Sequence, residues 1–196
     1  MAHQGVKFRT EIISEIIPKD PRIKGLKYWC KVFHRYNLTP PHKSGSCGNL
    51  SFRLEDGKDS FIVTGSRIGL KDALPDNCFV KVSSVDLEKG IVRAYGTKEP
   101  SSESMLHFAI YCRRKDVNAI FHGHSQEILS CVNKSKIKIP ETKREEPYGS
   151  IELLQSVLEV LDNEYFLAMK KHGFISLGRT MKEAGEFALQ IYRKCI

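Results

Sequence analysis

Two histidines stand two residues apart in the stretch Phe121–Ser125, directly after a short apolar run. In a β-strand, residues i and i+2 point to the same face with Cα atoms about 7 Å apart, whereas in a helix they would point to nearly opposite sides. The apolar run over residues 117–121 favours a strand, so His122 and His124 can approach one atom. Gly123 between them removes bulk from the opposite face. The pair indicates a metal site, with two surface or hydrogen-bonded histidines as the alternative.

A metal site needs a third ligand, and His172 is the candidate because it follows another apolar strand segment and precedes a glycine. Without the other two histidines, we would interpret His172 as a histidine in a turn. Three imidazoles hold zinc in a tetrahedron and leave one position open, which is the catalytic rather than the structural pattern. His107 lies four residues after Glu103 on the same expected helical face, so it has either a direct metal role or a structural hydrogen bond.

Two further segments have the composition of an anion site. Ser101 and Ser102 stand at an expected helix start, where free backbone N–H groups and the helix dipole favour an anion. In the stretch SGSCGNLS, Gly45 and Gly48 permit close backbone approach and Asn49 supplies an amide. The alternatives are an ordinary helix cap for the serines and a plain turn before a strand for the glycines.

The elements that must position these side chains follow from periodicity and turn signals. Antiparallel strand pairs are expected on either side of the Asp56-Gly57 and Lys89-Gly90 turns. The expected fold class is mixed α/β with a mainly antiparallel sheet, in a single domain over residues 1–196. The expected helices cover residues 20–38, 100–114, 149–163 and 179–194. In the first of them, Asp20 is the expected cap and Pro21 stands in the first turn. The expected strands cover the hairpins 49–65 and 78–96, the single strand 116–125 and the strand pair 164–178.

Composition narrows the class of protein. Of the 196 residues, 41% are hydrophobic and 28% charged, which is typical of a soluble globular protein. No apolar run approaches the ~18 residues of a membrane helix, and no secretory signal is seen at the N-terminus. The six cysteines are scattered without a CxxC pair, which suggests a reducing cytoplasm rather than a disulfide scaffold.

The formal net charge is +8 and the isoelectric point about 9.2. Such a charge suits nucleic acid or an anionic metabolite. Nucleic-acid binders concentrate basic residues on one element, whereas here they are spread out among acids. The densest cluster alternates Lys134, Lys136 and Lys138, which we interpret as one solvated face of a strand, with a binding patch as the alternative. A nucleic-acid role therefore rests on charge alone.

Taken together, the segments resemble the class II aldolase/adducin family, from about Tyr28 to about Arg193. Their order and spacing together make the match specific. The matching pieces are Gly48-Asn49-Leu50-Ser51-Phe52-Arg53, Pro100-Ser101-Ser102-Glu103 with His107 and Tyr111, Asp116-Val117 leading to His122-Gly123-His124-Ser125, Pro147-Tyr148-Gly149, and His172-Gly173 with Gly178 and the Glu183-Ala184 helix.

The resemblance implies a three-layer α/β/α fold and a homotetramer with active sites at subunit interfaces. It implies that His122, His124 and His172 bind a divalent metal, most often zinc, and that Glu103 carries protons. It also implies a phosphorylated ketose as substrate, split to dihydroxyacetone phosphate and an aldehyde. The residues expected to bind phosphate are Gly48, Asn49, Ser66, Arg67, Ser101 and Ser102.

The chemistry of the residues agrees with this expectation. Breaking a C–C bond beside a carbonyl leaves an enediolate, whose charge a zinc ion can stabilise through the carbonyl and hydroxyl oxygens. A nearby carboxylate such as Glu103 can move the proton. A phosphate anchored at the helix start would fix the substrate against the metal, so that part of the barrier is offset by positioning.

The chain departs from the family in two places. The family loop Thr-Pro-Ser/Thr-Gly reads Thr64-Gly65-Ser66-Arg67 here. Ser66 can still contact a phosphate. Arg67 replaces a glycine, and there are three alternatives for its role: it adds a bidentate anion contact, it narrows the pocket, or it faces solvent. The segment between His124 and His172 is short for the family, and we find no match for the tyrosine that a neighbouring subunit contributes in sugar-phosphate aldolases.

Three rival functions follow from the same resemblance. A pentulose-phosphate 4-epimerase of this family generally has aspartate where this chain has Glu103, and a methylthioribulose-phosphate dehydratase generally lacks an acid there, so Glu103 favours an aldolase. A non-catalytic, adducin-like interaction module loses the metal histidines, which this chain keeps. Zinc content separates the enzymes from the binding module.

Overall fold

The structure is a computed structural model that describes residues 8–43, 45–133 and 138–196. Its helices are α1 (Ile23–Arg35), α2 (Ser104–Arg113), α3 (Gln126–Asn133), α4 (Ile151–Leu161) and α5 (Met181–Cys195), with a 3-10 turn η1 (Asp76–Cys78). Its strands are β1 (Arg9–Ser14), β2 (Pro41–His42), β3 (Gly45–Ser46), β4 (Asn49–Arg53), β5 (Phe61–Thr64), β6 (Phe79–Asp86), β7 (Ile91–Tyr95), β8 (Ala119–Gly123), β9 (Phe166–Met169) and β10 (Gly173–Gly178).

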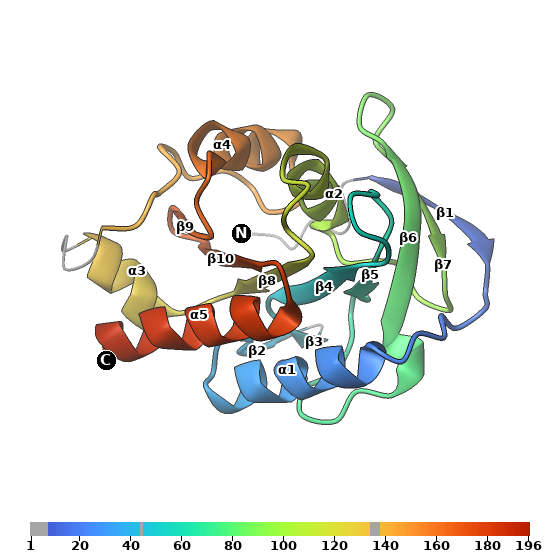
Figure 1. Cartoon of the computed structure of the whole chain (residues 1–196), viewed down its shortest axis with the longest axis horizontal. Coiled ribbons are helices and arrows are strands. Elements are labelled where there is room, and N and C mark those ends of the chain that lie inside the picture. The colour runs from blue at the N-terminus through green and yellow to red at the C-terminus, as the bar shows by residue number, and fades with distance from the viewer. Residues whose placement is uncertain (1–7, 44, 134–137) are drawn as a thin grey trace.

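The described residues form three layers around one large sheet (Figure 1). Eight strands pair in the order β1-β7-β6-β5-β4-β8-β10-β9, and β2 pairs with β3 in a separate small hairpin. Within the large sheet, β1 runs parallel to β7 and the remaining described pairs are antiparallel. Helices α1, α3 and α5 cover one face and α2 and α4 the other. The predicted α/β class with a mainly antiparallel sheet is confirmed.

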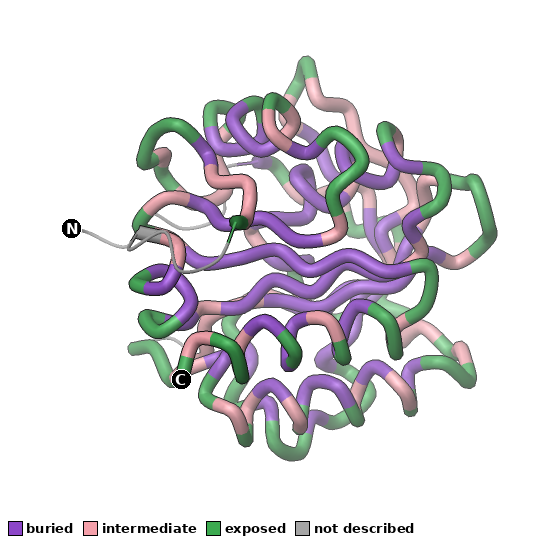
Figure 2. Tube along the Cα trace, turned by 60° about the vertical axis from the view of Figure 1, so that its left-hand side comes forward, coloured by how far each residue is buried: buried purple, intermediate pink, exposed green. Residues whose placement is uncertain are grey.

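The centre of the sheet is buried on both faces (Figure 2). Every residue of β4, β8, β9 and β10 is buried. Strand β9 is wholly apolar and β8 and β10 are mostly so, whereas β4 alternates polar and apolar residues even though all of them are buried. On the α1/α5 side the core is aromatic, with Phe33 edge-on to Phe121 at 5.5 Å between ring centroids and tilted against Phe174 at 6.2 Å. The polar residues of these strands are therefore held in a rigid, dry frame.

Both expected hairpins form. Strands β4 and β5 pair antiparallel on either side of the Asp56-Gly57 turn, and β6 and β7 do so around Lys89-Gly90. Gly57 and Gly90 adopt φ values of 72° and 61°, a conformation that glycine reaches without steric cost. The turn residues therefore predicted the pairing of half of the strands in the large sheet correctly.

The helix expected from Pro100 begins later, at Ser104, with Glu103 at the N-cap. Pro100 instead pairs with Gly65 in an isolated bridge. Both the backbone N–H and the hydroxyl of Ser104 donate to the carbonyl of Ser101, at 2.9 and 2.7 Å. Ser101 and Ser102 therefore lie in a turn just before the helix, and the predicted start of this helix at Pro100 is wrong by four residues.

The first helix is also shorter than the 20–38 expected, because it begins at Ile23. Asp20 does not cap it as predicted. Its carboxylate binds the backbone and guanidinium of Arg22, at 2.7–2.9 Å, and the cap residue is Arg22 without a side-chain cap hydrogen bond.

Sequence reasoning missed the edge strand β1, the helix α3 and the β2–β3 hairpin, which lies in a segment expected to be a plain loop. The strand expected to carry Lys134, Lys136 and Lys138 cannot be compared in full, since residues 134–137 lie outside the described residues. Lys138 is exposed and is not in a strand.

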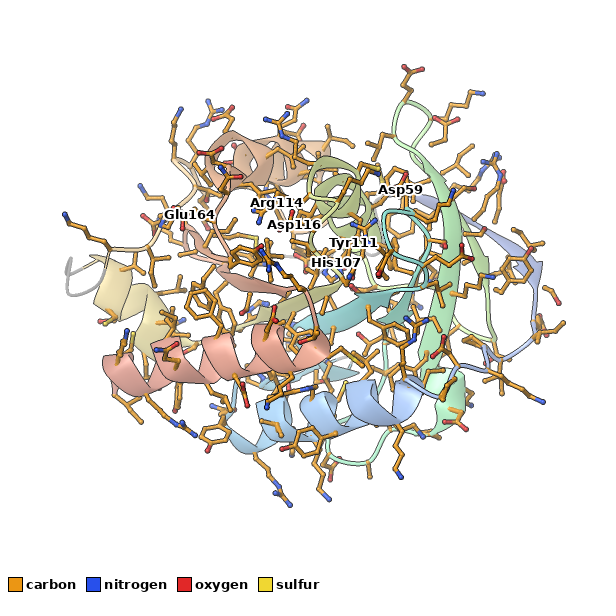
Figure 3. All side chains as sticks on the ribbon, in the orientation of Figure 1. Asp59, His107, Tyr111, Arg114, Asp116 and Glu164 are labelled. Atoms are coloured by element: carbon orange, nitrogen blue, oxygen red, sulfur yellow. The ribbon has the colours of Figure 1, made fainter. Side chains whose placement is uncertain are left out.

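The end of α2 is joined to the connection between α4 and β9 by Arg114 and Asp116, both labelled in Figure 3. The Arg114 guanidinium binds the Asp116 carboxylate at 2.9 Å through two nitrogens and donates to the carbonyls of Asp162 and Glu164 at 3.0 and 2.8 Å. The Tyr165 hydroxyl also donates to Asp116. Among the described residues, no helix combines the length and apolar composition needed to cross a membrane.

Candidate metal centre

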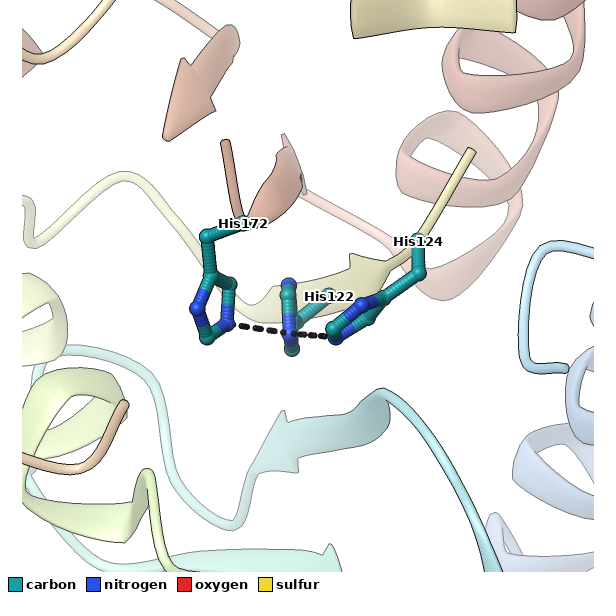
Figure 4. Close-up of side chains that lie close together, drawn as sticks. All are labelled: His122, His124 and His172. Atoms are coloured by element: carbon teal, nitrogen blue, oxygen red, sulfur yellow. Dashed lines mark hydrogen bonds between the residues drawn. The ribbon is translucent and has the colours of Figure 1, made fainter. Parts of the chain in front are cut away.

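Three imidazoles converge at the end of the sheet where β8 and β10 meet (Figure 4). His122 Nε2 lies 3.0 Å from His124 Nε2 and 3.3 Å from His172 Nε2. The three ring nitrogens that would bind a metal lie within 4.8 Å of one another, and no other such group of histidine, cysteine or acidic side chains is found in the part of the chain that the structure describes. The structure thus brings together the three predicted ligands.

Local backbone contacts explain this convergence. His122 is the fourth residue of β8, whereas His124 lies just past the strand end and its backbone N–H donates to the carbonyl of Leu38 at 2.8 Å. A Cβ at Gly123 would meet Phe174 at 2.5 Å, and one at Gly173 would meet the carbonyl oxygen of Gly123 at 2.4 Å. The expectation that Gly123 removes bulk from the opposite face agrees with these contacts.

The tautomer of His122 is fixed by its other nitrogen. His122 Nδ1 lies 2.8 Å from the carbonyl oxygen of Phe174. Because a carbonyl can only accept, the proton belongs on Nδ1, and Nε2 carries a lone pair directed at the other two rings. Burial lowers the pKa of His122 and holds that of His124 well below its usual value, and the neighbouring imidazoles act in the same direction on both.

The donor set fits a zinc ion. Two nitrogens bound to a tetrahedral zinc at about 2.05 Å lie about 3.3 Å apart, close to the two Nε2–Nε2 distances of 3.0 and 3.3 Å. A metal requires neutral imidazoles, and the lowered pKa values of His122 and His124 favour that form. Metal dependence is general in the class II aldolase family, and this triad could bind such an ion.

Glu103 lies directly against these nitrogens. Its carboxylate oxygens are 3.1 Å from His122 Nε2 and 3.0 Å from His172 Nε2, and the Asn49 amide donates to it at 2.8 Å. Burial opposes ionisation of this carboxyl group, but the two imidazoles and the amide outweigh burial and hold the pKa of Glu103 well below its usual value. A carboxylate in this position can accept a proton at a point next to the metal ligands.

A ladder of buried polar contacts holds Glu103 against the sheet. Asn49 and Ser51 are alternate residues of β4 and so point to the same face. Asn49 contacts Glu103, and the Ser51 hydroxyl contacts His107 Nδ1 at 2.7 Å and the Tyr111 hydroxyl at 2.8 Å. Figure 3 shows His107 and Tyr111 between α2 and the sheet. His107 is thus in a structural hydrogen bond, and it is not in the group that could bind a metal.

All ten predicted site residues line one cavity of about 620 Å³. They are Gly48, Asn49, Ser66, Arg67, Ser101, Ser102, Glu103, His122, His124 and His172. A larger hollow of about 810 Å³ lies beside Trp29, Arg179 and Arg193, and none of the ten residues lines it. The smaller cavity is therefore the place where metal and phosphate chemistry could meet.

The glycine-rich loop approaches the metal centre closely, as expected. Gly48 has φ 72°, and a Cβ there would meet the carbonyl oxygen of His122 at 2.6 Å. Gly45 has φ 143°, and a Cβ there would meet the carbonyl oxygen of Ile68 at 2.0 Å. Arg67 lines the same cavity, but its side chain is 69% exposed and lies 3.8 Å from Glu99. Arg67 therefore lies at the exposed rim of the cavity.

Sequence reasoning assigned no site role to the eight other residues that line this cavity. They are His42, Ser46, Cys47, Gly65, Ile68, Gln126, Tyr148 and Lys171. Tyr148 belongs to the Pro147-Tyr148-Gly149 piece, and it comes from the same chain rather than a neighbouring one. Ser46, Cys47 and Gly65 stand in the two loops that the sequence singled out. Lys171 stands next to His172. The other three carry no pattern that would have singled them out.

Comparison with known proteins agrees with this geometry. Residues 25–195 match the family described as Class II Aldolase and Adducin N-terminal domain. An L-fuculose phosphate aldolase of Methanocaldococcus jannaschii is 31% identical over 155 residues, which cover 71% of this chain and 77% of that protein. A 5-methylthioribulose-1-phosphate/5-deoxyribulose-1-phosphate aldolase of Rhodospirillum rubrum is 28% identical over 163 residues, or 75% of this chain and 68% of that protein.

Solved structures share the fold. An L-fuculose 1-phosphate aldolase superposes with a TM-score of 0.74 at 19% identity, covering 91% of this chain and 85% of the other. A sugar-phosphate aldolase from Thermotoga maritima gives 0.72 at 18% identity, covering 88% and 91%. The same three-layer architecture is thus present in both. With the match over residues 25–195, the chain belongs to the class II aldolase and adducin N-terminal domain family.

Proposed function

We propose that this protein is a zinc-dependent aldolase that cleaves a phosphorylated ketose to dihydroxyacetone phosphate and an aldehyde. One observation carries the proposal: a single buried carboxylate, Glu103, lies 3.0–3.1 Å from the Nε2 atoms of two of three clustered imidazoles. A base next to a metal site is the arrangement that proton abstraction beside a carbonyl requires.

In this proposal each residue has a separate task. His122, His124 and His172 hold the metal, which when bound supplies electrostatic stabilisation of the negative charge that develops on the substrate oxygens. In the cleavage direction Glu103 takes the proton of the hydroxyl on the carbon that leaves as the aldehyde, and after the C–C bond breaks it gives a proton to the carbon left negatively charged. Asn49 orients Glu103 through its amide, 2.8 Å from the carboxylate.

The phosphate of the substrate is assigned to the opposite part of the same cavity. Ser66, Ser101 and Ser102 line it together with the glycine-rich loop at Gly48. Hydroxyl and backbone N–H donors suit a phosphate, and Arg67 adds a charge at the rim. Anchoring the phosphate there would hold the reacting carbon near Glu103 and the histidines.

Relatives give a second reaction to test. A 3-oxo-tetronate 4-phosphate decarboxylase of Haemophilus influenzae is 33% identical over 91 residues, which cover 45% of this chain and 39% of that protein. Loss of carbon dioxide from a 3-oxo acid leaves the same kind of charge next to a carbonyl as C–C cleavage does. The two reactions differ in whether a base such as Glu103 must move a proton from a hydroxyl group of the substrate.

We further propose a homotetramer that works in the cytoplasm and a single domain over residues 1–196. Family resemblance supports the tetramer. Cysteine usage supports a reducing compartment, because all six cysteines are free thiols and such thiols persist where disulfides do not form.

The test is a panel of phosphorylated ketoses and 3-oxo acid phosphates supplied to the zinc-loaded protein. The proposal expects release of dihydroxyacetone phosphate from at least one ketose phosphate, measured with a coupled dehydrogenase. Carbon dioxide release from a 3-oxo acid phosphate, with no dihydroxyacetone phosphate released from any ketose phosphate, would replace the aldolase with a decarboxylase. Inversion of a ketose phosphate without cleavage would replace it with an epimerase.

A further inference from the structure

Lys71 is a buried lysine that the proposed reaction does not use. It lies between β5 and η1, and only 1% of its surface is exposed. Its ammonium donates to the hydroxyl of Ser46 at 2.7 Å and to the carbonyls of Cys47 and Ser46 at 3.0 and 3.4 Å. All of these acceptors are neutral, and they belong to the loop that approaches the metal centre.

The described residues offer this ammonium no anionic partner. No carboxylate lies within ion-pair distance of Lys71 among them. The ionisable groups nearest to it are thiols: Cys30 on α1, Cys47 in the loop and Cys78 on η1. The imidazoles of His122 and His124 also feel its charge, and they carry no negative charge that could offset it. Burial raises the pKa of all three thiols, that of Cys30 to about 12, so they are neutral near pH 7 and do not balance the charge.

The other basic residues of the cavity differ in this respect. Arg67 lies 3.8 Å from Glu99, and Lys171 lies 3.1 Å from Glu145. Both line the cavity, and each has a carboxylate near enough to offset part of its charge. Lys71 is the buried cation of this region whose charge the described residues leave uncompensated.

A buried charge without a counter-ion is costly to keep in a folded protein. The cost falls if an anion binds on the other side of the loop. Ser46 and Cys47, the two residues that Lys71 contacts, both line the cavity that holds the candidate phosphate site. One thin segment of backbone therefore separates the ammonium from the space where an anion would sit.

From this geometry we infer that Lys71 is the fixed counter-charge of the anion site: it holds the loop at Ser46 and Cys47 and attracts a phosphate dianion without touching it. The inference deepens the proposed function and rests on its phosphate site. Lys71 is thus a positioning residue whose effect on affinity comes from its charge rather than from its hydrogen bonds alone.

The charge of Lys71 also predicts a pH dependence. Burial lowers the pKa of Lys71 to about 8, so its ammonium is lost as the pH rises through that value. Inorganic phosphate is already a dianion there, because its relevant pKa is near 6–7. Affinity for phosphate should therefore fall above about pH 8 in the parent protein.

The test is a titration of inorganic phosphate into the zinc-loaded protein by calorimetry at pH 7.5. Lys71→Met removes the charge and the hydrogen bonds, whereas Lys71→Gln removes the charge and keeps a donor. Both should bind phosphate roughly tenfold or more weakly, the scale of one charge beside a partly buried ion. Lys89→Met is the matched control, because Lys89 is exposed in the β6–β7 turn and pairs with Asp86 at 3.7 Å; it should bind phosphate as the parent does.

Other results would overturn the inference. Unchanged affinity in Lys71→Met would show that its charge does not reach the site. Retained affinity in Lys71→Gln with loss in Lys71→Met would show a structural tether. Should neither variant fold, the parent protein decides: phosphate affinity that stays level from pH 7.5 to 9.5 contradicts the inference, and affinity that drops about tenfold supports it.

These outcomes are separable from the fate of the proposed reaction. Phosphate binding that depends on Lys71 in a protein without aldolase activity would sustain the inference and remove the aldolase. Release of dihydroxyacetone phosphate by a protein whose phosphate affinity does not depend on Lys71 would sustain the aldolase and remove the inference.

Discussion

Glu103 is a residue on which burial and charge act in opposite directions. Removing a carboxylate from water favours its neutral form, yet His122, His172 and Asn49 hold the pKa of Glu103 well below its ordinary value. A zinc ion on the histidines would also favour the carboxylate form. The carboxylate form of Glu103 therefore depends on positive charge at the imidazole cluster, which a bound metal would supply while the imidazoles stay neutral.

This dependence predicts how zinc content responds to loss of one imidazole. His122→Ala should bring the protein from about one zinc per chain to nearly none after dialysis, because two remaining imidazoles bind far more weakly than three. Elemental analysis of the pure protein measures this. His42→Ala is the matched control, since His42 lines the same cavity but is outside the triad. Equal zinc in parent and His122→Ala would remove the site.

The burial of a second residue, His107, leads us to expect that the stability of the protein depends on pH. Burial lowers the pKa of His107 from 6.5 to about 3, so the unfolded state binds one more proton than the folded state between these values. Stability should therefore fall as the pH drops below 6.5, by up to about 1.4 kcal/mol per pH unit from this group.

His107→Asn isolates that contribution, because its amide occupies the place of Nδ1 and can still bond to Ser51. Urea unfolding between pH 7 and pH 4.5 should give a shallower loss of stability in this variant than in the parent. His34→Asn on α1 controls for removal of a histidine elsewhere. Parallel curves for parent and His107→Asn would show that His107 is not held neutral by the fold.

At the scale of elements, β4 is the part that joins the two halves of the site. It pairs with β8 so that Asn49 stands opposite His122, and its next residue on the same face, Ser51, binds α2 through His107. Two-residue periodicity predicted that His122 and His124 approach one another, whereas Asn49 was singled out by its glycine-rich loop and the family resemblance. Their neighbours across the sheet could not be read from one strand, because register is set by the whole set of pairings.

The elements that sequence reasoning missed had no local signal strong enough to show them. Strand β1 is a parallel edge strand whose partner β7 lies far along the chain, so no turn marks the pairing. The start of α2 was misplaced because Pro100 and the two serines have the composition of a helix entry, while the bridge from Gly65 to Pro100 holds the chain extended there. Tertiary pairing decided where the helix begins.

The contact of α5 with α1 predicts the effect of a single methyl group. A Cβ at Gly185 would lie 2.2 Å from the Trp29 ring. Gly185→Ala should therefore destabilise the protein by roughly 1–3 kcal/mol through overpacking, despite the gain in helix propensity of about 1 kcal/mol. Urea unfolding measures it. Gly69→Ala, where a Cβ meets nothing within 4 Å, should change stability little. A stabilised Gly185→Ala would show that the helices separate easily.

At the scale of the whole molecule, the sheet has two edges, at β1 and β9. The β1 edge and the segment after it expose three isoleucines, Ile12, Ile13 and Ile16, at 39%, 50% and 66%. Exposed apolar residues on an edge strand favour contact with another chain, which is consistent with the proposed assembly without defining its symmetry.

Light scattering at micromolar concentration tests the assembly. The proposal expects a mass near four times the 22.3 kDa of one chain. Ile13→Lys in the edge strand should shift the protein toward smaller species if β1 takes part, whereas Ile196→Lys, at an exposed end of the chain, serves as the control. A parent protein that runs as a 22.3 kDa monomer contradicts the tetramer.

The central claim is that Glu103 moves a proton to and from a substrate carbon beside a metal held by three histidines. Cleavage in reverse begins with removal of a proton from dihydroxyacetone phosphate, so this half-reaction can be followed without knowing the aldehyde. Proton NMR in D₂O should show exchange of a hydrogen on the hydroxymethyl carbon with the zinc-loaded protein. Glu103→Gln, with its zinc content unchanged, should slow this exchange by roughly 10²–10⁴-fold. No exchange above the uncatalysed rate in the parent protein, or equal exchange in the variant, would contradict the account.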